Sequence, residues 1–306
     1  MSGKRVGKEE KISGKLVKEK QKKKFLFCFG MGFTAKALVQ RLPDSEWDFS
    51  GTFRPSGKND SLPGTNLLPF DGSKATPDIE AALSKATHLL VTIPPQPSGD
   101  VVLQNFGSKI KDCKNLQWIG YISSTGVYGD TRGEWVDESS ILQPETELHV
   151  LRVKAEEEWL KSGYDCPVML FRCVAIYGPG RNLLLSVKQG RARRIEKPGL
   201  VFSRIHVEDL AQVLEASIKN PKPGEIYNVS DDRPSPPSET VEYACRLLKV
   251  EPPPLIPYES AELTEIARGF YKTCKRVDNK KIKEELGVKL KYPDYKSGLD
   301  AIFKSM

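Results

Sequence analysis

The alternation of short apolar runs with longer amphipathic segments is the feature that most constrains how this chain can fold. It begins at Lys24 and is regular as far as Gly178. Short runs that are almost wholly apolar are typical of strands buried on both faces, and helices between such strands produce a parallel sheet. The sequence predicts strands at 25–29, 49–53, 66–70, 88–93, 116–123 and 168–173, with helices at 34–42, 77–85, 100–110 and 145–161. It therefore predicts an α/β fold with a doubly wound parallel sheet.

The second half of the chain follows a different pattern. Prolines between positions 234 and 257 interrupt the rhythm of strands and helices. We expect one domain at 25–178 and a smaller lobe at 179–306, some of whose elements return to the sheet. Helices are predicted at 207–219, 238–249, 261–269 and 279–286, and Gly287 is expected to end the last of them.

A glycine-rich turn follows the first predicted strand and leads directly into the first predicted helix. It reads Gly30-Met31-Gly32-Phe33-Thr34-Ala35. In the dinucleotide-binding turn of a Rossmann fold, the first small residue allows a tight turn, the second lets the backbone approach the pyrophosphate, and the third lets the helix pack on the strand. Gly30, Gly32 and Ala35 fit these roles, and the helix N-terminus at Phe33 and Thr34 would face the phosphates. The sequence therefore predicts a dinucleotide site.

The end of the second predicted strand indicates which dinucleotide binds. An acidic residue there would bind the ribose 2′-hydroxyl of NAD, whereas an arginine would bind the 2′-phosphate of NADP. Arg54 stands at this place, with Ser56 and Lys58 nearby. Asp48 lies at the beginning of the strand, far from the expected cofactor. The sequence therefore favours NADP over NAD.

Several motifs, taken in order, resemble those of the extended short-chain dehydrogenase/reductases, the NAD(P)-dependent epimerase/dehydratase family. The resemblance covers almost everything after the first 24 residues. Beside the glycine turn, its motifs are Asp71 after the third strand, Ser123-Ser124-Thr125-Gly126-Val127-Tyr128-Gly129 after the fifth, and the segments 176–182, 204–211 and 227–232. The resemblance implies that Asp71 contacts the adenine and that the lobe at 179–306 binds the substrate. At the end of the fourth strand, Thr92 and Pro94 are expected to contact the cofactor.

The resemblance also implies two catalytic positions. In this family a Ser or Thr at the end of the fifth strand binds the substrate oxygen, and a Tyr activated by a Lys four residues later moves the proton. Ser124 matches the first position, with a serine that merely caps the strand end as the alternative. The chain has no Tyr between Tyr128 and Tyr164, so the second position departs from the pattern.

Two registers remain open for the missing Tyr. If Lys154 takes the Lys position, Val150 replaces the Tyr; if Arg152 takes it, Leu148 does. The motif at 152–159 is most similar to that of the atypical YeeZ-like branch, which also lacks the Tyr.

Other groups could move the proton in place of the Tyr. General acid–base groups contribute about 10²–10⁴-fold to a rate, and His149 titrates near neutrality. However, it neighbours the vacant position, and one helical residue turns a side chain by about 100°, so we expect its ring to point elsewhere. Tyr128 is a second candidate, although a structural role is favoured for it. His206 is expected to be a hydrogen-bonded structural histidine.

The net charge of +7 is concentrated in one segment. Residues 1–24 hold ten Lys or Arg and three Glu, so the remaining residues are neutral overall. A nucleic-acid-binding fold needs positive charge on its own surface, and we therefore do not expect nucleic acid as a partner of the folded part. The tail is expected to be solvated, with nuclear import or contact with an anionic surface as alternatives.

Composition excludes other classes of protein. No apolar stretch approaches the roughly 20 residues that cross a bilayer, so no membrane contact is expected. Six cysteines without a CxxC pair and three dispersed histidines predict reduced thiols and no metal site. We expect a cytoplasmic protein, with the plastid stroma or nucleus as alternatives, and the sequence leaves open whether it forms a homodimer.

Two hypotheses of function remain. The first is an NADP-dependent oxidoreductase or epimerase that acts on a small polar metabolite, for example a sugar derivative. The second is an NADP-binding redox-sensing or scaffold protein without turnover, which the missing Tyr motivates. Binding of RNA by the basic tail is a third, weaker alternative.

Overall fold

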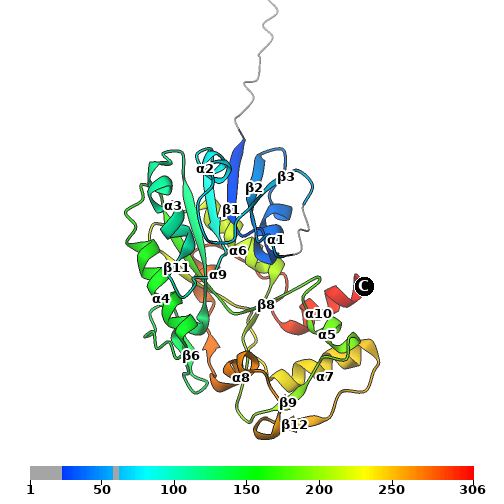
Figure 1. Ribbon diagram of the computed structural model, residues 1–306. Coiled ribbons are helices and arrows are strands. Elements are labelled where there is room, and N and C mark those ends of the chain that lie inside the picture. Colours follow the sequence, from blue (N-terminus) through cyan, green and yellow to red (C-terminus); the bar gives the residue numbers. More distant parts are fainter. Residues whose placement is uncertain (1–22, 58–61) are drawn as a thin grey trace, which may run out of the picture.

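The centre of the molecule is a parallel sheet of seven strands. The computed structural model describes residues 23–57 and 62–306. The strand order is β11-β7-β5-β4-β1-β2-β3 (Figure 1), and every pairing is parallel. The strands are β1 (Lys24–Phe29), β2 (Trp47–Phe53), β3 (Thr65–Pro69), β4 (His88–Val91), β5 (Trp118–Ser124), β7 (Val168–Cys173) and β11 (Ile226–Val229). The predicted doubly wound α/β fold is confirmed.

Helices cover both faces of this sheet. One face carries α1 (Phe33–Arg41), α6 (Val207–Lys219) and α9 (Lys280–Glu284), and the other carries α2 (Pro77–Leu83), α3 (Val101–Asp112) and α4 (Glu147–Leu160). Successive side chains of a strand point to opposite faces. In β1, Leu26 and Cys28 accordingly pack in the first layer, while Phe27 and Phe29 pack in the second. Both layers are fully buried at β1, which explains its unbroken apolar sequence.

The six predicted strands are present, with ends that differ by one or two residues. The strand β4 ends at Val91 rather than at Ile93, just before Pro94 and Pro95, neither of which has an N–H for the ladder. The prediction missed β11, which pairs with β7. The helix α4 begins at Glu147 instead of 145, because Thr146 accepts a hydrogen bond from the amide of His149 and caps the helix there.

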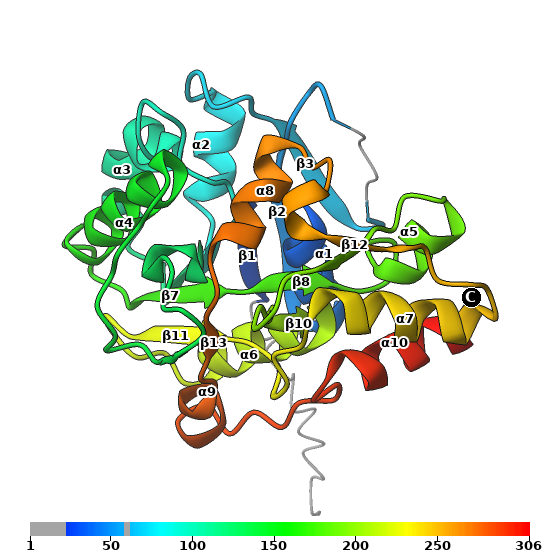
Figure 2. The same cartoon turned by 90° about the horizontal axis from the view of Figure 1, so that it is seen from below.

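A smaller lobe lies beyond the carboxyl ends of the central strands (Figures 1 and 2). It contains α5 (Leu183–Lys188), α7 (Pro237–Leu248), α8 (Glu265–Lys272), α10 (Tyr295–Lys304), η2 (Tyr258–Ser260) and the strand pair β9 (Arg194–Glu196) with β12 (Leu255–Pro257). Near it are η1 (Thr125–Tyr128) and the pairs β8 (Ala175–Tyr177) with β10 (Arg204–His206) and β6 (Trp135–Val136) with β13 (Arg276–Val277). The predictions for α6, α7 and α9 are confirmed within two residues. The prediction of a helix at 261–269 is wrong by about one turn, since Thr264 caps α8.

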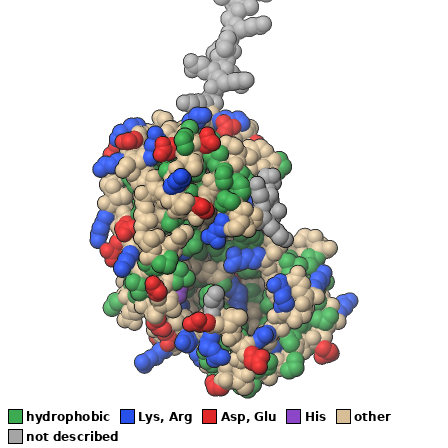
Figure 3. Space-filling view, in the orientation of Figure 1, with side chains coloured by type: hydrophobic (Ala, Val, Ile, Leu, Met, Phe, Trp, Pro, Cys, Tyr) green, Lys and Arg blue, Asp and Glu red, His purple; other side chains and the backbone are tan. Residues whose placement is uncertain are grey.

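The surface is hollowed between the sheet and the smaller lobe. Figure 3 shows this hollow with Lys and Arg side chains along its wall. In α/β sheets, ligands bind at the carboxyl ends of the strands, which is where this hollow lies. In the part of the chain that the structure describes, no helix is long and apolar enough to cross a membrane. Residues 1–22, which hold most of the basic tail, and Lys58 lie outside the described residues.

Candidate functional site

The glycine turn is fixed by the ends of two neighbouring strands. The amide of Gly30 donates to Thr52 Oγ1 at 2.9 Å, and the amide of Met31 donates to the carbonyl of Thr52 at 2.7 Å. From the other side, Thr92 Oγ1 donates to the carbonyl of Gly30 at 2.7 Å. Gly30 has φ +91°, and a Cβ there would lie 2.5 Å from Thr92 Oγ1, which is a steric clash. The protein itself therefore requires glycine at position 30.

Gly32 differs from Gly30, because a Cβ at Gly32 would meet no protein atom within 4 Å. Gly32 occupies the N-cap position of α1, no side chain caps this helix, and its first turn has no acidic residue. The free amides and the positive end of the helix dipole thus face an open space, which suits a pyrophosphate. Ala35 is fully buried against the sheet, and Thr34 is nearly so. The residues predicted for the glycine turn therefore form one turn between β1 and α1.

Phe33 joins the glycine turn to a segment from the second half of the chain. The guanidinium carbon of Arg181 lies 5.7 Å from the centre of the Phe33 ring. The backbone of Gly178 packs against the same ring, since a Cβ there would lie 3.3 Å from its Cζ atom. The turn that carries Arg181 is closed by two hydrogen bonds between Gly178 and Arg181. An exposed cation therefore stands beside the N-terminus of α1.

The strand ends next to β1 hold the remaining predicted cofactor residues. Arg54 follows β2 directly and is exposed. As expected, Asp48 lies at the opposite end of β2. Its carboxylate pairs there with Lys23 at 3.1 Å. Asp71, after β3, accepts a hydrogen bond from the amide of Ser73 at 2.8 Å. Hydrogen bonding by the side chain of Ser73 and then by its amide lowers the pKa of the Asp71 carboxyl group. Pro94, after β4, is exposed.

Ser124 ends β5 and caps the short helix η1. Its Oγ accepts a hydrogen bond from the amide of Gly126 at 3.1 Å. The capping role foreseen as the alternative is therefore present. It does not exclude the other role, because a serine hydroxyl that accepts one hydrogen bond still has its proton to donate.

The helix α4 presents Arg152, and not Lys154, to the end of β5. Arg152 Nη1 donates to the carbonyl of Ile122 at 2.9 Å and to Tyr121 OH at 3.2 Å. Lys154 is exposed and shares a shallow surface hollow with Glu157, Glu158 and Lys161. The structure thus places the side chain of Arg152 against the strand that ends at Ser124, through Tyr121 and Ile122, and leaves Lys154 at the surface. Four residues before Arg152 stands Leu148, 54% exposed.

The ring of His149 packs on Gly126, so the expectation that it points away from the end of β5 is wrong. A Cβ at Gly126 would overlap the Nε2, Cδ2 and Cε1 atoms of the imidazole. Burial of the ring, followed by the charges of Lys275 and Arg152, lowers the pKa of His149, while Glu145 acts in the opposite direction.

A buried polar network lies behind Ser124, and the sequence analysis missed it. Glu156 on α4 accepts from Ser123 Oγ and from Arg172, with Arg172 Nη2 at 2.8 Å from Glu156 Oε2. Arg172 also donates to Tyr128 OH at 2.9 Å, and Tyr128 donates to Asn228 Oδ1 at 2.7 Å. These side chains are at least 96% buried. The available signal was the charged Arg172 inside the apolar run 168–173, since a buried charge needs a partner.

Two further expectations are confirmed by this geometry. The network holds Tyr128 on both sides and buries it completely, in agreement with the structural role favoured for it. His206 is 1% exposed and caps α6, with its Nδ1 accepting from the amide of Glu208 at 3.2 Å.

Known proteins are similar to this chain in sequence and in fold. A conserved protein of unknown function from Silicibacter pomeroyi is 42% identical, with a TM-score of 0.83 over 92% of this chain and 99% of that chain. Protein YeeZ of Escherichia coli is 27% identical over 87% of this chain and 95% of its own length. The dTDP-glucose 4,6-dehydratase of Bacillus anthracis, at 16% identity, has the same fold, with a TM-score of 0.75 over 92% of this chain and 96% of that chain.

The chain shares the fold of NAD-dependent epimerases and dehydratases of the extended short-chain dehydrogenase/reductase type, and its sequence is similar to that of Protein YeeZ. The resemblance predicted from the motifs is thereby confirmed. No protein-family model matches the chain.

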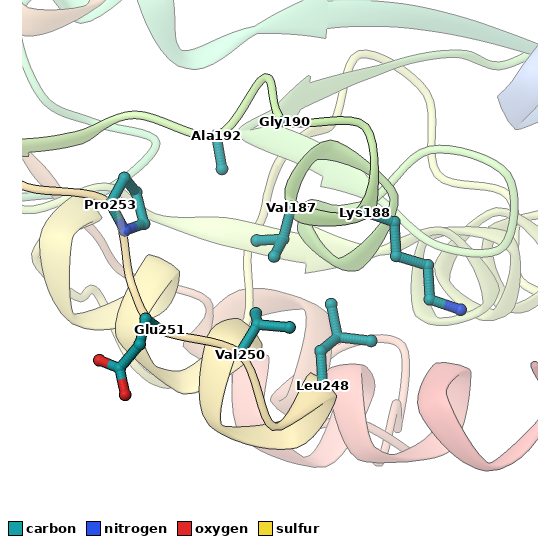
Figure 4. A pocket seen from close by; sticks show the side chains of 8 residues that line it. All are labelled: Val187, Lys188, Gly190, Ala192, Leu248, Val250, Glu251 and Pro253. Atoms are coloured by element: carbon teal, nitrogen blue, oxygen red, sulfur yellow. The ribbon is translucent and has the colours of Figure 1, made fainter.

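Outside this site, the smaller lobe has another surface hollow, of about 530 Å³. Figure 4 shows the side chains around it, from α5 and from the end of α7 and the loop that follows. They are Val187, Lys188, Gly190, Ala192, Leu248, Val250, Glu251 and Pro253. None of the predicted site residues is among them. Within residues 23–57 and 62–306, no three His, Cys, Asp or Glu side chains are grouped as a metal site requires.

Proposed function

We propose that the chain is an NADP-dependent oxidoreductase or epimerase that acts on a small polar metabolite, for example a sugar derivative. The observation that carries the proposal is the open, uncapped glycine turn at Gly32 together with Ser124 at the end of β5. The strands β1 and β5 are separated only by β4. At about 4.8 Å per strand, their ends lie about 10 Å apart, so one extended dinucleotide could have its pyrophosphate at the first and its nicotinamide near the second.

The choice of a nicotinamide cofactor has independent support. Structures of this fold have been solved with NAD, among them the Bacillus anthracis dehydratase and MoeE5, which also holds UDP-glucose. The preference for NADP rests on Arg54, whose exposed guanidinium at the end of β2 suits a 2′-phosphate.

Each predicted site residue has a separate role in this proposal. The turn from Gly30 to Ala35 and the α1 N-terminus hold the pyrophosphate, while Asp71, Thr92 and Pro94 border the cofactor. Ser124 donates a hydrogen bond to the substrate oxygen, and Arg152 adds positive charge near the end of β5. The nicotinamide supplies the hydride donor or acceptor when the cofactor is bound.

A second candidate is an NADP-binding protein without turnover. The observation that favours it is the aliphatic residue Leu148 four residues before Arg152, where related enzymes have the proton-transferring Tyr. Such a protein would bind the cofactor with the same residues and sense its redox state.

Thermal unfolding tests the cofactor. A ligand that binds only the folded state at 100 times its Kd stabilises that state by about 2.7 kcal/mol, so NADP should raise the Tm by several degrees and NAD by less. Loss of one charge-assisted contact costs about 1.5–3 kcal/mol, so Arg54→Ala should weaken NADP binding about 10- to 100-fold and leave NAD binding nearly unchanged. Asp48→Asn, at the far end of β2, is the matched control. Absence of any shift with either dinucleotide would contradict the proposal.

Turnover separates the two candidates. NADPH oxidation is followed against a panel of carbonyl compounds and nucleotide sugars, with Ser124→Ala expected to lower kcat/KM at least 10-fold. Because this variant also removes a helix cap, Ser297→Ala, which removes one arm of the capping box of α10, controls for lost stability. Cofactor binding without turnover on any compound would favour the second candidate.

A further inference from the structure

The imidazole of His149 and the hydroxyl of Ser124 meet at the same backbone unit. The His149 ring lies on the Cα of Gly126, and the amide of Gly126 donates to Ser124 Oγ at 3.1 Å. Only a residue without a Cβ leaves room for the ring at this place. Gly126 has a negative φ, so its backbone conformation does not require glycine. Glycine at position 126 instead provides the space that the imidazole ring occupies.

Of the three histidines in the sequence, His149 alone has a ring that is accessible and unengaged. His88 and His206 are 3% and 1% exposed, and in each the Nδ1 atom has a hydrogen-bond partner, Thr87 Oγ1 and the amide of Glu208 respectively. His149 is half-buried, and neither of its ring nitrogens hydrogen-bonds to another residue in the described ranges. Both nitrogens are thus available to a ligand.

The charges around His149 come from three elements. Lys275, just before β13, and Arg152, on the same helix, are cationic, whereas Glu145, in the loop before α4, is anionic. Lys275 is itself half-buried, and burial lowers the pKa of its ammonium group. Burial and the two cations favour the neutral imidazole, so the ring can accept a proton at pH 7.

We infer that His149 is the acid–base residue of this site and performs the role that the Tyr has in related enzymes, from the neighbouring position in the chain; the inference rests on the proposed function. In the oxidation of an alcohol, the imidazole would take the O–H proton of the substrate, and a bound oxidised nicotinamide would supply the acceptor for the hydride that leaves the carbinol carbon with the C–H electron pair. The imidazolium then loses its proton to water. Ser124 holds the substrate oxygen within reach of the ring, and in the reverse direction the imidazolium returns the proton.

The first test uses the pH dependence of turnover. In the direction of alcohol oxidation with NADP⁺, where the ring acts as a base, His149→Gln should lower kcat/KM about 10²- to 10³-fold and remove the acid limb of the pH profile below pH 6.5. Glu158→Gln, on the exposed face of the same helix, is the matched control. Gly126→Ala should give a similar loss because the added methyl displaces the ring, and the double variant should be no slower than His149→Gln alone. A His149→Gln enzyme within threefold of the unchanged protein at every pH would overturn the inference.

The second test needs no substrate. Three histidines give three ring signals in NMR, and the signal missing from His149→Gln is assigned by difference. Because the oxidised nicotinamide carries a positive charge that the reduced one lacks, the pKa of His149 should be lower with NADP⁺ than with NADPH. An identical pKa in the two complexes overturns the inference, whereas failure of both nucleotides to bind contradicts the proposed function instead.

Discussion

Gly30 and Gly32 belong to one motif, but glycine is needed at the two positions for different physical reasons. A side chain at Gly30 would be strained by its positive φ and would collide with Thr92, whereas a side chain at Gly32 would enter open space. The first glycine is thus required by the fold and the second by whatever approaches the turn.

Alanine substitutions should separate these two requirements. Gly30→Ala should lower the free energy of unfolding by about 1–3 kcal/mol or more, the usual cost of a strained backbone position. Gly32→Ala should change it by less than about 1 kcal/mol, the usual size of a cap effect, and weaken NADP binding at least 10-fold. Urea unfolding without ligand and calorimetric titration with NADP measure the two effects. Equal loss of stability in both variants would show that Gly32 also serves the fold.

The sequence was sufficient to predict the position of single residues that stand at a strand end. Gly30, Arg54 and Ser124 each follow a run of apolar residues, and the parallel sheet brings such ends to one edge. The orientation of His149 could not be predicted in this way. It depends on how α4 packs against η1, which is a contact between separate elements that the local sequence pattern does not give.

At the scale of elements, the pair formed by Glu156 and Arg172 joins α4 to β7. Both side chains are at least 96% buried, so removal of one charge leaves the other without compensation, at a cost of about 3–5 kcal/mol. Glu156→Gln should therefore lower the free energy of unfolding by about this amount, as measured by urea denaturation.

Two further variants test the reason for this loss. Lys161→Gln breaks an ion pair with Glu157 on the same helix, but both side chains are more than half exposed, so the loss should stay below about 1 kcal/mol. The double variant Glu156→Gln/Arg172→Met, which leaves no unpaired charge, should be more stable than Glu156→Gln. If it is less stable, the unpaired guanidinium is not the cause.

The elements that the sequence did not predict are those defined by contacts distant in the chain. The strand β11 has four residues, and its identity as an edge strand comes from pairing with β7. The helix α10 starts with a capping box, in which Asp294 is the N-cap residue and Ser297 holds the third position, where Glu or Gln is more usual. Regular segments such as α6 were predicted at the correct bounds because their apolar periodicity suffices.

At the scale of the whole molecule, two buried histidines should make stability depend on pH. Burial lowers the pKa values of His88 and His206 to about 4. Between pH 6.5 and 4 the unfolded chain therefore binds protons that the folded chain does not. The free energy of unfolding should be unaffected by these groups above pH 6.5 and fall below it, by up to about 1.4 kcal/mol per pH unit for each histidine.

Urea denaturation at pH 7, 6 and 5 measures this slope. His88→Phe keeps an aromatic ring beside Trp47 and Trp118. It should reduce the dependence of the free energy of unfolding on pH by the contribution of one histidine. An unchanged slope in this variant would mean that other groups take up the protons.

The strand β11 joins the sheet beside β7, although α5, β9 and α6 separate the two in the chain. At roughly 5–20 residues per second, a ribosome needs several seconds to reach β11 after it has finished β7. During that time the sheet ends in an unpaired edge, which another chain can join. The helix α10, which packs on α7, is made last, so the smaller lobe closes only near the end of translation. The growing chain, more than the finished protein, is therefore the form that depends on protection by chaperones.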